Sequence, residues 1–220
     1  MKRTLTGIAI GAAVICAIIF LPVYVLRAAV AFLCILAFAE YTILWRRKVN
    51  VSNLSFLSGL LILLGYAAIG VGLMSLPEIA ARYGNLMMLY TVAIVKFSDV
   101  GGFAFGLSSA KLMKNRGGNH KMCPTISPGK SWEGLVGSLV FSSAVSCGFI
   151  GVTHFSVSKS VALGVVAAIV GTAGDLVESK FKRWVGVKDS STMKITNGLG
   201  GFLDMFDSLI FAPAVLSCFY

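Results

Sequence analysis

Long apolar segments alternate with short basic ones along most of the chain. A helix that crosses a bilayer needs about 20 mostly apolar residues. The apolar segments predict about seven such helices, with these approximate bounds: 5–21, 28–45, 54–74, 86–106, 132–153, 160–178 and 198–219. The first segment resembles a signal peptide, but equally apolar segments follow it, so we expect it to be retained as a helix. The pattern predicts an all-α, polytopic integral membrane helix bundle.

Composition supports this class. Of the 220 residues, 57% are hydrophobic and 13% are charged, and the mean hydropathy is +0.86. Soluble domains contain roughly 25% charged residues, and no polar stretch here is long enough for a separate soluble domain. The five cysteines lie mostly in apolar runs without a CxxC pair. We expect them to be packing residues rather than disulfide partners or zinc ligands.

The basic residues gather at one set of helix ends. Fifteen of the 19 Lys and Arg lie there, only Arg27, Arg82 and Lys159 lie at the opposite ends, and Lys96 falls inside a predicted helix. The positive-inside rule then predicts a cytoplasmic N-terminus and an external C-terminus. The net charge of +10 on this face fits attraction to anionic lipids or a polyanionic substrate. Nucleic acid is not expected as a partner, because the basic loops are short and contain no recognisable binding module.

Seven of the nine acidic residues lie from Asp99 onward. Four aspartates fall within or at the edges of predicted helices: Asp99, Asp175, Asp204 and Asp207. Charge at bilayer depth is costly and indicates function. We therefore expect these side chains to face the interior, where metal ions or basic groups offset their charge.

The spacing of the acids adds to this interpretation. Asp204 and Asp207 stand three residues apart, so on a helix both project from one face. Asp175, Glu178 and Lys182 share a stripe in the same way. Carboxylate oxygens suit Mg²⁺, whereas scarce thiol and imidazole groups argue against zinc. The alternative for the aspartate pair is neutralisation by a nearby Lys or Arg.

Several motifs resemble those of the phosphatidate cytidylyltransferases (CDP-diacylglycerol synthases). Residues 178–191 read ESKFKRWVGVKDSS, and residues 200–208 read GGFLDMFDS. Together they resemble the C-terminal signature of that family. Upstream, ISPGKSWEG at 126–134, SDVGGFAFG at 98–106 and GDL at 174–176 resemble further family segments. The resemblance covers roughly residues 86–213. At two positions the chain departs from the family pattern, with Leu199 for a histidine and Met205 for an arginine.

The resemblance implies transfer of a cytidylyl group from CTP to phosphatidic acid, giving CDP-diacylglycerol and pyrophosphate in phospholipid biosynthesis. It implies residues 1–85 as a scaffold of transmembrane helices and 86–220 as the catalytic region, with a polar cavity that faces the cytoplasm. The expected location is the inner (plasma) membrane of a bacterium. The expected partners are CTP, phosphatidic acid and membrane lipids, and a homodimer is compatible with the family although no motif specifies one.

Carried over residue by residue, the resemblance also implies roles within the site. The implied catalytic residues are Asp175, Lys182, Arg183, Lys188, Asp189, Asp204 and Asp207. The implied substrate-binding residues are Asp99, Ser127, Lys130, Glu133, Ser179, Gly200 and Gly201. Asp175, Asp204 and Asp207 would bind Mg²⁺, with a second cation left open. Lys182, Arg183 and Lys188 would hold phosphate groups.

Two other functions stay open at the level of the sequence. A catalytically silent relative that binds lipid or nucleotide would account for Leu199 and Met205. A cation transporter would use the intramembrane aspartates, but we find no internal repeat of the kind that many transporters contain. The sequence distinguishes neither acyl from ether lipids nor CTP from dCTP.

Overall fold

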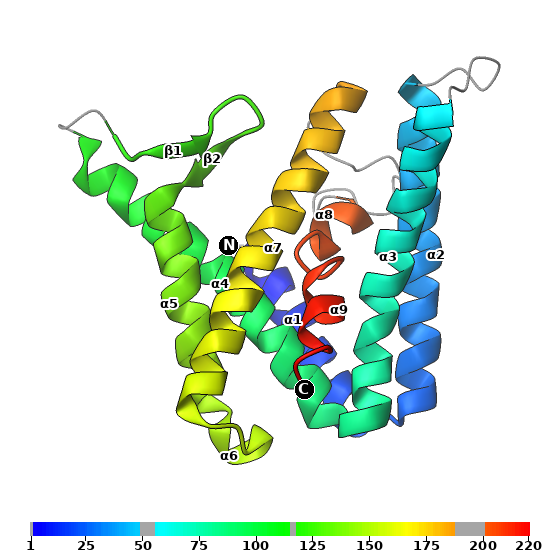
Figure 1. Cartoon of the computed structure of the whole chain (residues 1–220), viewed down its shortest axis with the longest axis vertical. Coiled ribbons are helices and arrows are strands. Elements are labelled where there is room, and N and C mark those ends of the chain that lie inside the picture. The colour runs from blue at the N-terminus through cyan, green and yellow to red at the C-terminus, as the bar shows by residue number, and fades with distance from the viewer. Residues whose placement is uncertain (1, 49–55, 115–117, 188–200) are drawn as a thin grey trace.

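The computed structural model describes residues 2–48, 56–114, 118–187 and 201–220, which form a helical bundle with one short β-hairpin (Figure 1). Its long helices are α1 (Lys2–Phe20), α2 (Val23–Lys48), α3 (Phe56–Tyr83), α4 (Asn85–Leu112), α5 (Trp132–Gly148) and α7 (Val157–Val185). Its short elements are α6 (Ile150–Thr153), α8 (Phe202–Phe206), α9 (Ala212–Leu216) and the antiparallel strands β1 (Lys121–Cys123) and β2 (Ser127–Ser131).

Four of these helices, α2, α3, α4 and α7, are long and apolar enough to cross a membrane. The chain is thus an integral membrane protein, and the predicted helical membrane bundle is confirmed. The predicted number of seven spanning helices is not confirmed. The β-hairpin of β1 and β2 was not predicted from the sequence.

The last predicted helix, 198–219, is wrong over its described part. Residues 201–220 form the two short helices α8 and α9, joined by a turn. Pro213 lies in the first turn of α9, where its missing N–H costs nothing and its fixed φ favours a helix start. Just after α8 ends, the Asp207 carboxylate accepts a hydrogen bond from the Ser208 N–H at 2.5 Å. A proline, and a carboxylate that accepts a hydrogen bond from a backbone N–H, thus interrupt an otherwise apolar segment.

Helices α4 and α5 pack through small residues. A Cβ atom on Gly137 of α5 would lie 2.5 Å from the Gly101 carbonyl oxygen of α4. Buried serines add hydrogen bonds, since Ser138 Oγ donates to the Ser98 carbonyl and Ser142 Oγ to the Ile94 carbonyl, both at 2.9 Å. Close backbone contact and interhelical hydrogen bonds are the interactions that associate helices in a bilayer. This packing holds α4, which carries Lys96 and Asp99, against α5.

Replacing Gly137 by valine is therefore expected to lower the free energy of unfolding by about 1–3 kcal/mol, because overpacking forces the two backbones apart. The matched control is Gly148→Val at the other end of α5, where an added Cβ would meet no atom within 4 Å. Unfolding in mixed micelles would measure both variants. Equal stability of the two would contradict this account of the packing.

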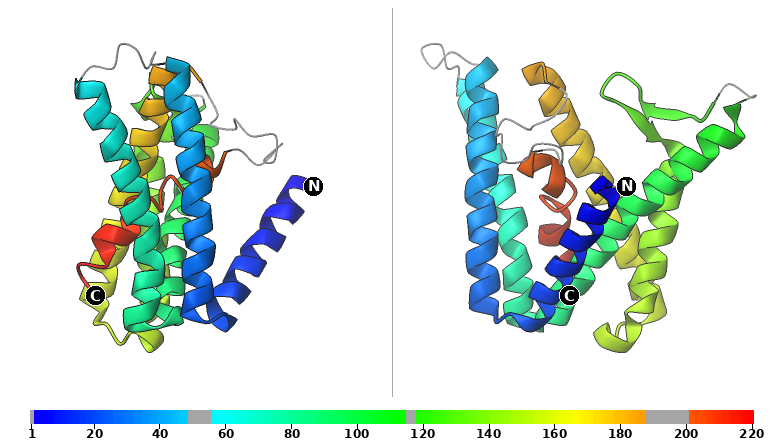
Figure 2. Two further views of the ribbon diagram at one scale, coloured as in Figure 1. Left: turned by 90° about the vertical axis from the view of Figure 1, so that its right-hand side faces the viewer. Right: turned by 180° about the vertical axis from the view of Figure 1, so that it is seen from behind.

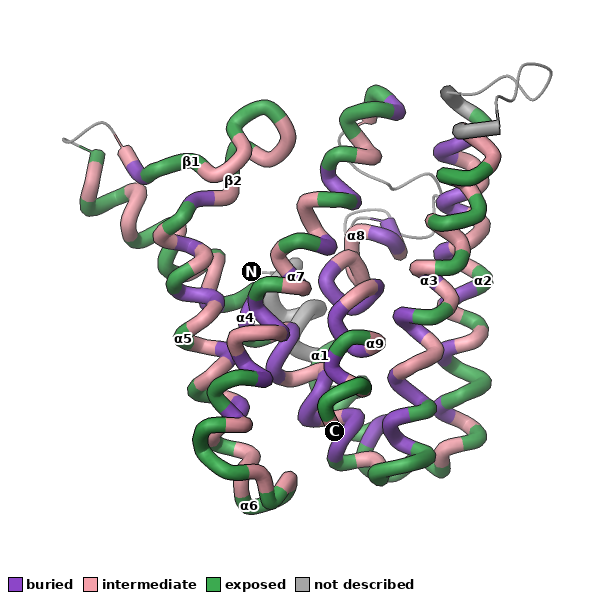
Figure 3. Tube along the Cα trace, in the orientation of Figure 1, coloured by how far each residue is buried: buried purple, intermediate pink, exposed green. Residues whose placement is uncertain are grey.

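The segment with α8 and α9 lies inside the bundle, where α8 packs against α2, and α9 against α3 and α7 (Figures 1 and 2). Buried positions lie on this segment and on α2, α3, α4 and α7 around it (Figure 3). The hairpin, the end of α2 and the end of α7 lie at one end of the bundle, and the α3–α4 turn and α6 lie at the other. The segment therefore brings its two aspartates into the interior, on the side of the hairpin.

Candidate functional site

A cavity of about 400 Å³ opens between the hairpin and helices α4, α5 and α7. Its lining is rich in charged and hydroxyl side chains, which are unusual inside an apolar bundle. The polar and charged residues of the lining are Lys96, Asp99, Ser127, Lys130, Ser131, Ser138, Thr172, Asp175, Asp204 and Asp207. All four intramembrane aspartates predicted to face the interior thus reach one cavity, as do the predicted binding residues Ser127 and Lys130.

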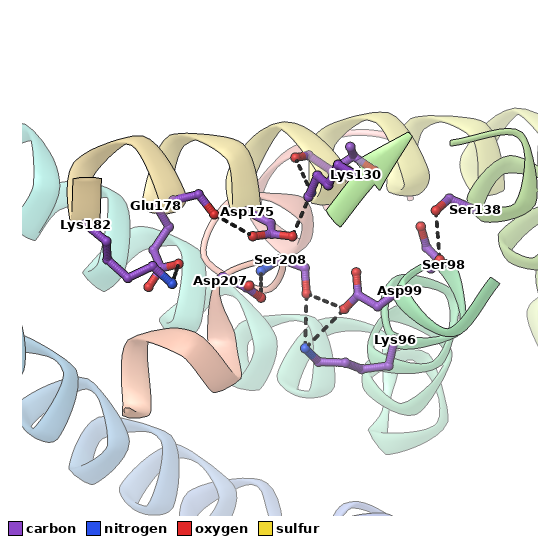
Figure 4. A network of polar contacts seen from close by, with 12 residues as sticks. Lys96, Ser98, Asp99, Lys130, Ser138, Asp175, Glu178, Lys182, Asp207 and Ser208 are labelled. Atoms are coloured by element: carbon purple, nitrogen blue, oxygen red, sulfur yellow. Dashed lines mark hydrogen bonds and ion pairs between the residues drawn. The ribbon is translucent and has the colours of Figure 1, made fainter. Parts of the chain in front are cut away.

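Three carboxylates converge, and two of them, Asp175 and Asp207, line this cavity. Oxygen atoms of Asp175 and Glu178 on α7 and of Asp207 after α8 all lie within 4.8 Å of one another (Figure 4). Hard oxygen donors in such a cluster fit Mg²⁺, which takes one or two protein carboxylates and completes its shell with water and phosphate oxygens. The donor set is therefore suited to a divalent cation that also contacts phosphates.

Two lysines approach the same carboxylates from different elements. Lys130 on β2 pairs with Asp175 at 2.6 Å and also donates to the Thr172 carbonyl at 3.1 Å. Lys182 lies between Glu178, at 2.7 Å, and Asp204, at 2.5 Å. Lys182 and Glu178 are nearly buried, with 12% and 6% of their side-chain surface exposed. Positive groups thus offset the charge that the low-dielectric interior would otherwise disfavour.

The structure separates the two aspartates that the sequence treated as a pair. Asp207 belongs to the carboxylate cluster, whereas Asp204 is held by Lys182 and accepts a hydrogen bond from the Gly201 N–H at 3.2 Å. The metal set implied by the resemblance was Asp175, Asp204 and Asp207. In the structure, Glu178 takes the place of Asp204 in the cluster.

Lys96 is a further cation of the cavity that the sequence analysis left without a role. Its ammonium lies 3.4 Å from Asp99 Oδ2, donates to Ser208 Oγ at 3.0 Å and donates to the Met205 carbonyl at 3.1 Å (Figure 4). Ser208 Oγ in turn donates to Asp99 Oδ2 at 2.8 Å. Lys96 therefore ties α4 to the turn that carries Asp207.

The hairpin forms one wall of the cavity, and hydrogen bonds at its base fix it in place. Ser131 Oγ accepts the Gly134 N–H at 3.1 Å and caps α5, while the Trp132 N–H donates to the His120 carbonyl at 3.0 Å. Side-chain caps of this kind satisfy an amide that has no partner within its helix. Lys130 is thereby held on β2, facing α7.

The remaining predicted residues divide between the edge of the site and positions away from it. Ser179 Oγ donates to Asp175 Oδ1 at 3.3 Å, so this residue supports the cluster. Arg183 Nε donates to the Ile126 carbonyl at 3.2 Å and fastens the hairpin loop. Glu133 accepts from the His120 ring at 2.7 Å and lies outside the cavity lining.

Three predicted residues, Lys188, Asp189 and Gly200, lie outside the described residues. The structure adds three residues to the site that were not among the predicted site residues: Glu178, Lys96 and Ser208. The stripe of Asp175, Glu178 and Lys182 was a usable signal for Glu178. A lone lysine inside an apolar segment was the signal for Lys96, because such a charge is rarely without function.

Comparison with known proteins gives a consistent result. A sequence model described as "Cytidylyltransferase family" matches residues 50–220. A phosphatidate cytidylyltransferase of Staphylococcus aureus (strain COL) is 37% identical over 180 residues. Proteins of the same name from Staphylococcus saprophyticus and Staphylococcus haemolyticus are each 36% identical, over 180 and 181 residues. Each alignment covers 81% of this chain and 63% of the relative, so the chain spans less than two thirds of the length of these relatives.

Proposed function

The chain belongs to the cytidylyltransferase family, and from this premise we propose that it transfers a cytidylyl group from CTP to phosphatidic acid, giving CDP-diacylglycerol and pyrophosphate. The observation that carries the proposal is the cluster of Asp175, Glu178 and Asp207 beside this cavity, with Lys130 paired to Asp175 and Lys182 paired to Glu178. Carboxylates for a cation beside lysines for phosphates are what a nucleotidyl transfer needs. The relatives named phosphatidate cytidylyltransferase indicate the lipid substrate.

In the proposed reaction, a phosphate oxygen of phosphatidic acid attacks the α-phosphorus of CTP. A new P–O bond forms there as the bond to the β-phosphate oxygen breaks, and pyrophosphate leaves with the electron pair. A phosphate monoester is already anionic, so no strong general base is required. This agrees with the residues that line the cavity, among which the described part of the chain contributes neither histidine nor cysteine.

The chain's own residues would act mainly by positioning and by charge stabilisation, which dominate transfer reactions at phosphorus. Lys130 and Lys182 supply positive charge beside the carboxylate cluster, and Lys96 supplies it on the α4 side. Arg183 and, outside the described residues, Lys188 and Asp189 belong to the same signature and are proposed to contact phosphate groups.

The proposed cofactor is Mg²⁺, held by Asp175, Glu178 and Asp207. When bound, it would supply positive charge that stabilises the leaving pyrophosphate. Asp204 is proposed to act through Lys182, because it contacts that ammonium group and lies outside the cluster of three carboxylates.

We further propose that the end of the bundle with the hairpin faces the cytoplasm, in a bacterial plasma membrane. The hairpin, with Lys121 and Lys130, and the last turns of α7, with Lys180, lie at this end (Figure 1), whereas Arg27, Arg82 and Lys159 belong to the opposite ends of α2, α3 and α7. An excess of basic residues marks the cytoplasmic side, which is also the side where CTP is made. In this arrangement residues 86–220 form the catalytic region and 1–85 form its scaffold.

The test is formation of CDP-diacylglycerol by the purified protein from CTP and phosphatidic acid, with Mg²⁺ present or removed by a chelator. We expect product with Mg²⁺ and none after chelation. In sealed inverted vesicles, CTP added outside should be consumed, and in right-side-out vesicles it should not. Binding of CTP without product would identify a silent relative, and cation flux without CTP consumption would identify a transporter.

A further inference from the structure

Glu40, in the middle of α2, is a buried acidic residue that the site described above does not include. It has 0% of its surface exposed. One carboxylate oxygen, Oε2, accepts a hydrogen bond from the Leu203 N–H of α8 at 3.0 Å. The other, Oε1, is buried and has no hydrogen-bond partner among the described residues. A carboxylate in such surroundings is costly, so its contact with the start of α8 calls for a functional explanation.

The N–H that Glu40 binds belongs to the short helix α8, which contains Asp204 and ends just before Asp207. Helix α8 has only five residues. The first N–H groups of a helix have no partner inside the helix. The residue before α8 is Gly201, which has no side chain to accept them. Two carboxylates supply acceptors instead, since Asp204 accepts from the Gly201 N–H and Glu40 accepts from the Leu203 N–H.

We propose that Glu40 is a positioning residue, which holds the first turn of α8 from α2 and thereby sets where Asp204 and Asp207 stand in the cavity. This inference rests on the proposed function for its effect on turnover. It also assigns α2 a part in the site, although α2 lies in the region that the sequence analysis regarded as scaffold. Positions 40 and 203 are 163 residues apart in sequence, so only the fold brings them together.

The proposal predicts that replacing Glu40 changes activity much more than it changes stability. Glu40→Leu removes the desolvation cost of a buried carboxylate but leaves the Leu203 N–H without its acceptor, so the two effects on stability oppose each other. Glu40→Leu should therefore fold, with a melting temperature close to that of the unmodified protein. Its α8 turn would lose the acceptor for Leu203, and groups that support metal ligands from outside typically change activity or metal affinity by about 10- to 100-fold.

The experiment compares Glu40→Leu, Glu40→Gln and the control Glu78→Leu in purified full chain. Glutamine keeps a side-chain oxygen that can accept the Leu203 N–H. Glu78 is also a helix glutamate, but it pairs with Arg27 at 2.8 Å, with 48% of its side chain exposed and away from the cavity. The measurements are kcat, the Mg²⁺ concentration for half-maximal rate, the melting temperature, and hydrogen exchange of the peptide that covers residues 201–208.

For Glu40→Leu we expect kcat to fall by about 10- to 100-fold, a higher Mg²⁺ requirement, faster exchange in the 201–208 peptide and a melting temperature close to that of the unmodified protein. Glu40→Gln should restore most of the activity and the slow exchange, and Glu78→Leu should change neither. Unchanged exchange or unchanged kcat in Glu40→Leu would overturn the proposal, as would a loss of activity matched by a loss of stability. Exchange is measured without substrate, so failure of the proposed reaction in the unmodified protein would leave this test intact.

Discussion

Replacing Asp207 by asparagine is expected to lower Mg²⁺-dependent turnover by about 100-fold or more, since even outer partners of metal ligands are worth 10- to 100-fold. Asp207 is the member of the carboxylate cluster that does not come from α7, and its oxygen lies within 4.8 Å of those of Asp175 and Glu178. Asparagine keeps an oxygen ligand but removes the negative charge. The Mg²⁺ concentration for half-maximal rate should therefore rise together with the loss of kcat.

The matched comparison is Asp204→Asn, the same substitution three residues earlier. Asp204 pairs with Lys182 at 2.5 Å, so its loss should impair turnover while changing the Mg²⁺ requirement less than Asp207→Asn does. Mg²⁺ titrations of both variants at saturating CTP measure the difference. A larger shift for Asp204→Asn would favour the ligand set implied by the resemblance, Asp175, Asp204 and Asp207, over the cluster seen in the structure.

The sequence predicted which carboxylates would face the interior, because charges inside apolar segments are rare. Asp99, Asp175, Asp204 and Asp207 were expected to face the interior, and all four line one cavity. The helical period placed Asp175, Glu178 and Lys182 on one stripe, and in the structure Lys182 pairs with Glu178 four residues away. Local spacing thus predicts contacts within one helix, because the backbone geometry fixes them.

Contacts between distant segments could not be predicted in this way. Lys130 reaches Asp175 because a β-hairpin folds over α7, and Glu40 reaches Leu203 because α8 packs against α2. The last predicted helix was wrong over its described part because an apolar segment of spanning length does not always form a single helix. Pro213 and the carboxylate of Asp207 break that segment, and hydropathy averaged over a window does not register either effect.

A division into scaffold and catalytic regions is also less sharp than hydropathy alone suggests. Helix α2 contributes Tyr41 and Trp45, whose rings pack against Phe181 of α7 at centroid distances of 5.1 and 5.7 Å. Phe181 directly precedes Lys182, so this aromatic contact bears on the helix turn that carries the buried lysine. The N-terminal helices thus support the site through packing as well as through Glu40.

Replacing Lys182 by methionine is expected to abolish turnover and also to destabilise the fold. The lysine is the cation between Glu178 and Asp204, whose side chains are only 6% and 19% exposed. Removing one partner of a buried ion pair leaves an uncompensated charge and costs about 3–5 kcal/mol. We expect the lower end of that range, because Asp204 keeps some contact with the cavity. Unfolding in mixed micelles and the CDP-diacylglycerol assay measure the two effects separately.

The control for this substitution is Lys180→Met on the exposed side of the same helix, which should leave both measurements close to those of the unmodified protein. A triple variant, Glu178→Met with Lys182→Met and Asp204→Leu, separates the two roles of the lysine. Apolar replacement of a whole buried ionic group is often neutral or stabilising, so stability should return while turnover stays absent. Recovery of turnover in the triple variant would contradict both a role for Lys182 in binding phosphate and a role for Glu178 in holding the cation.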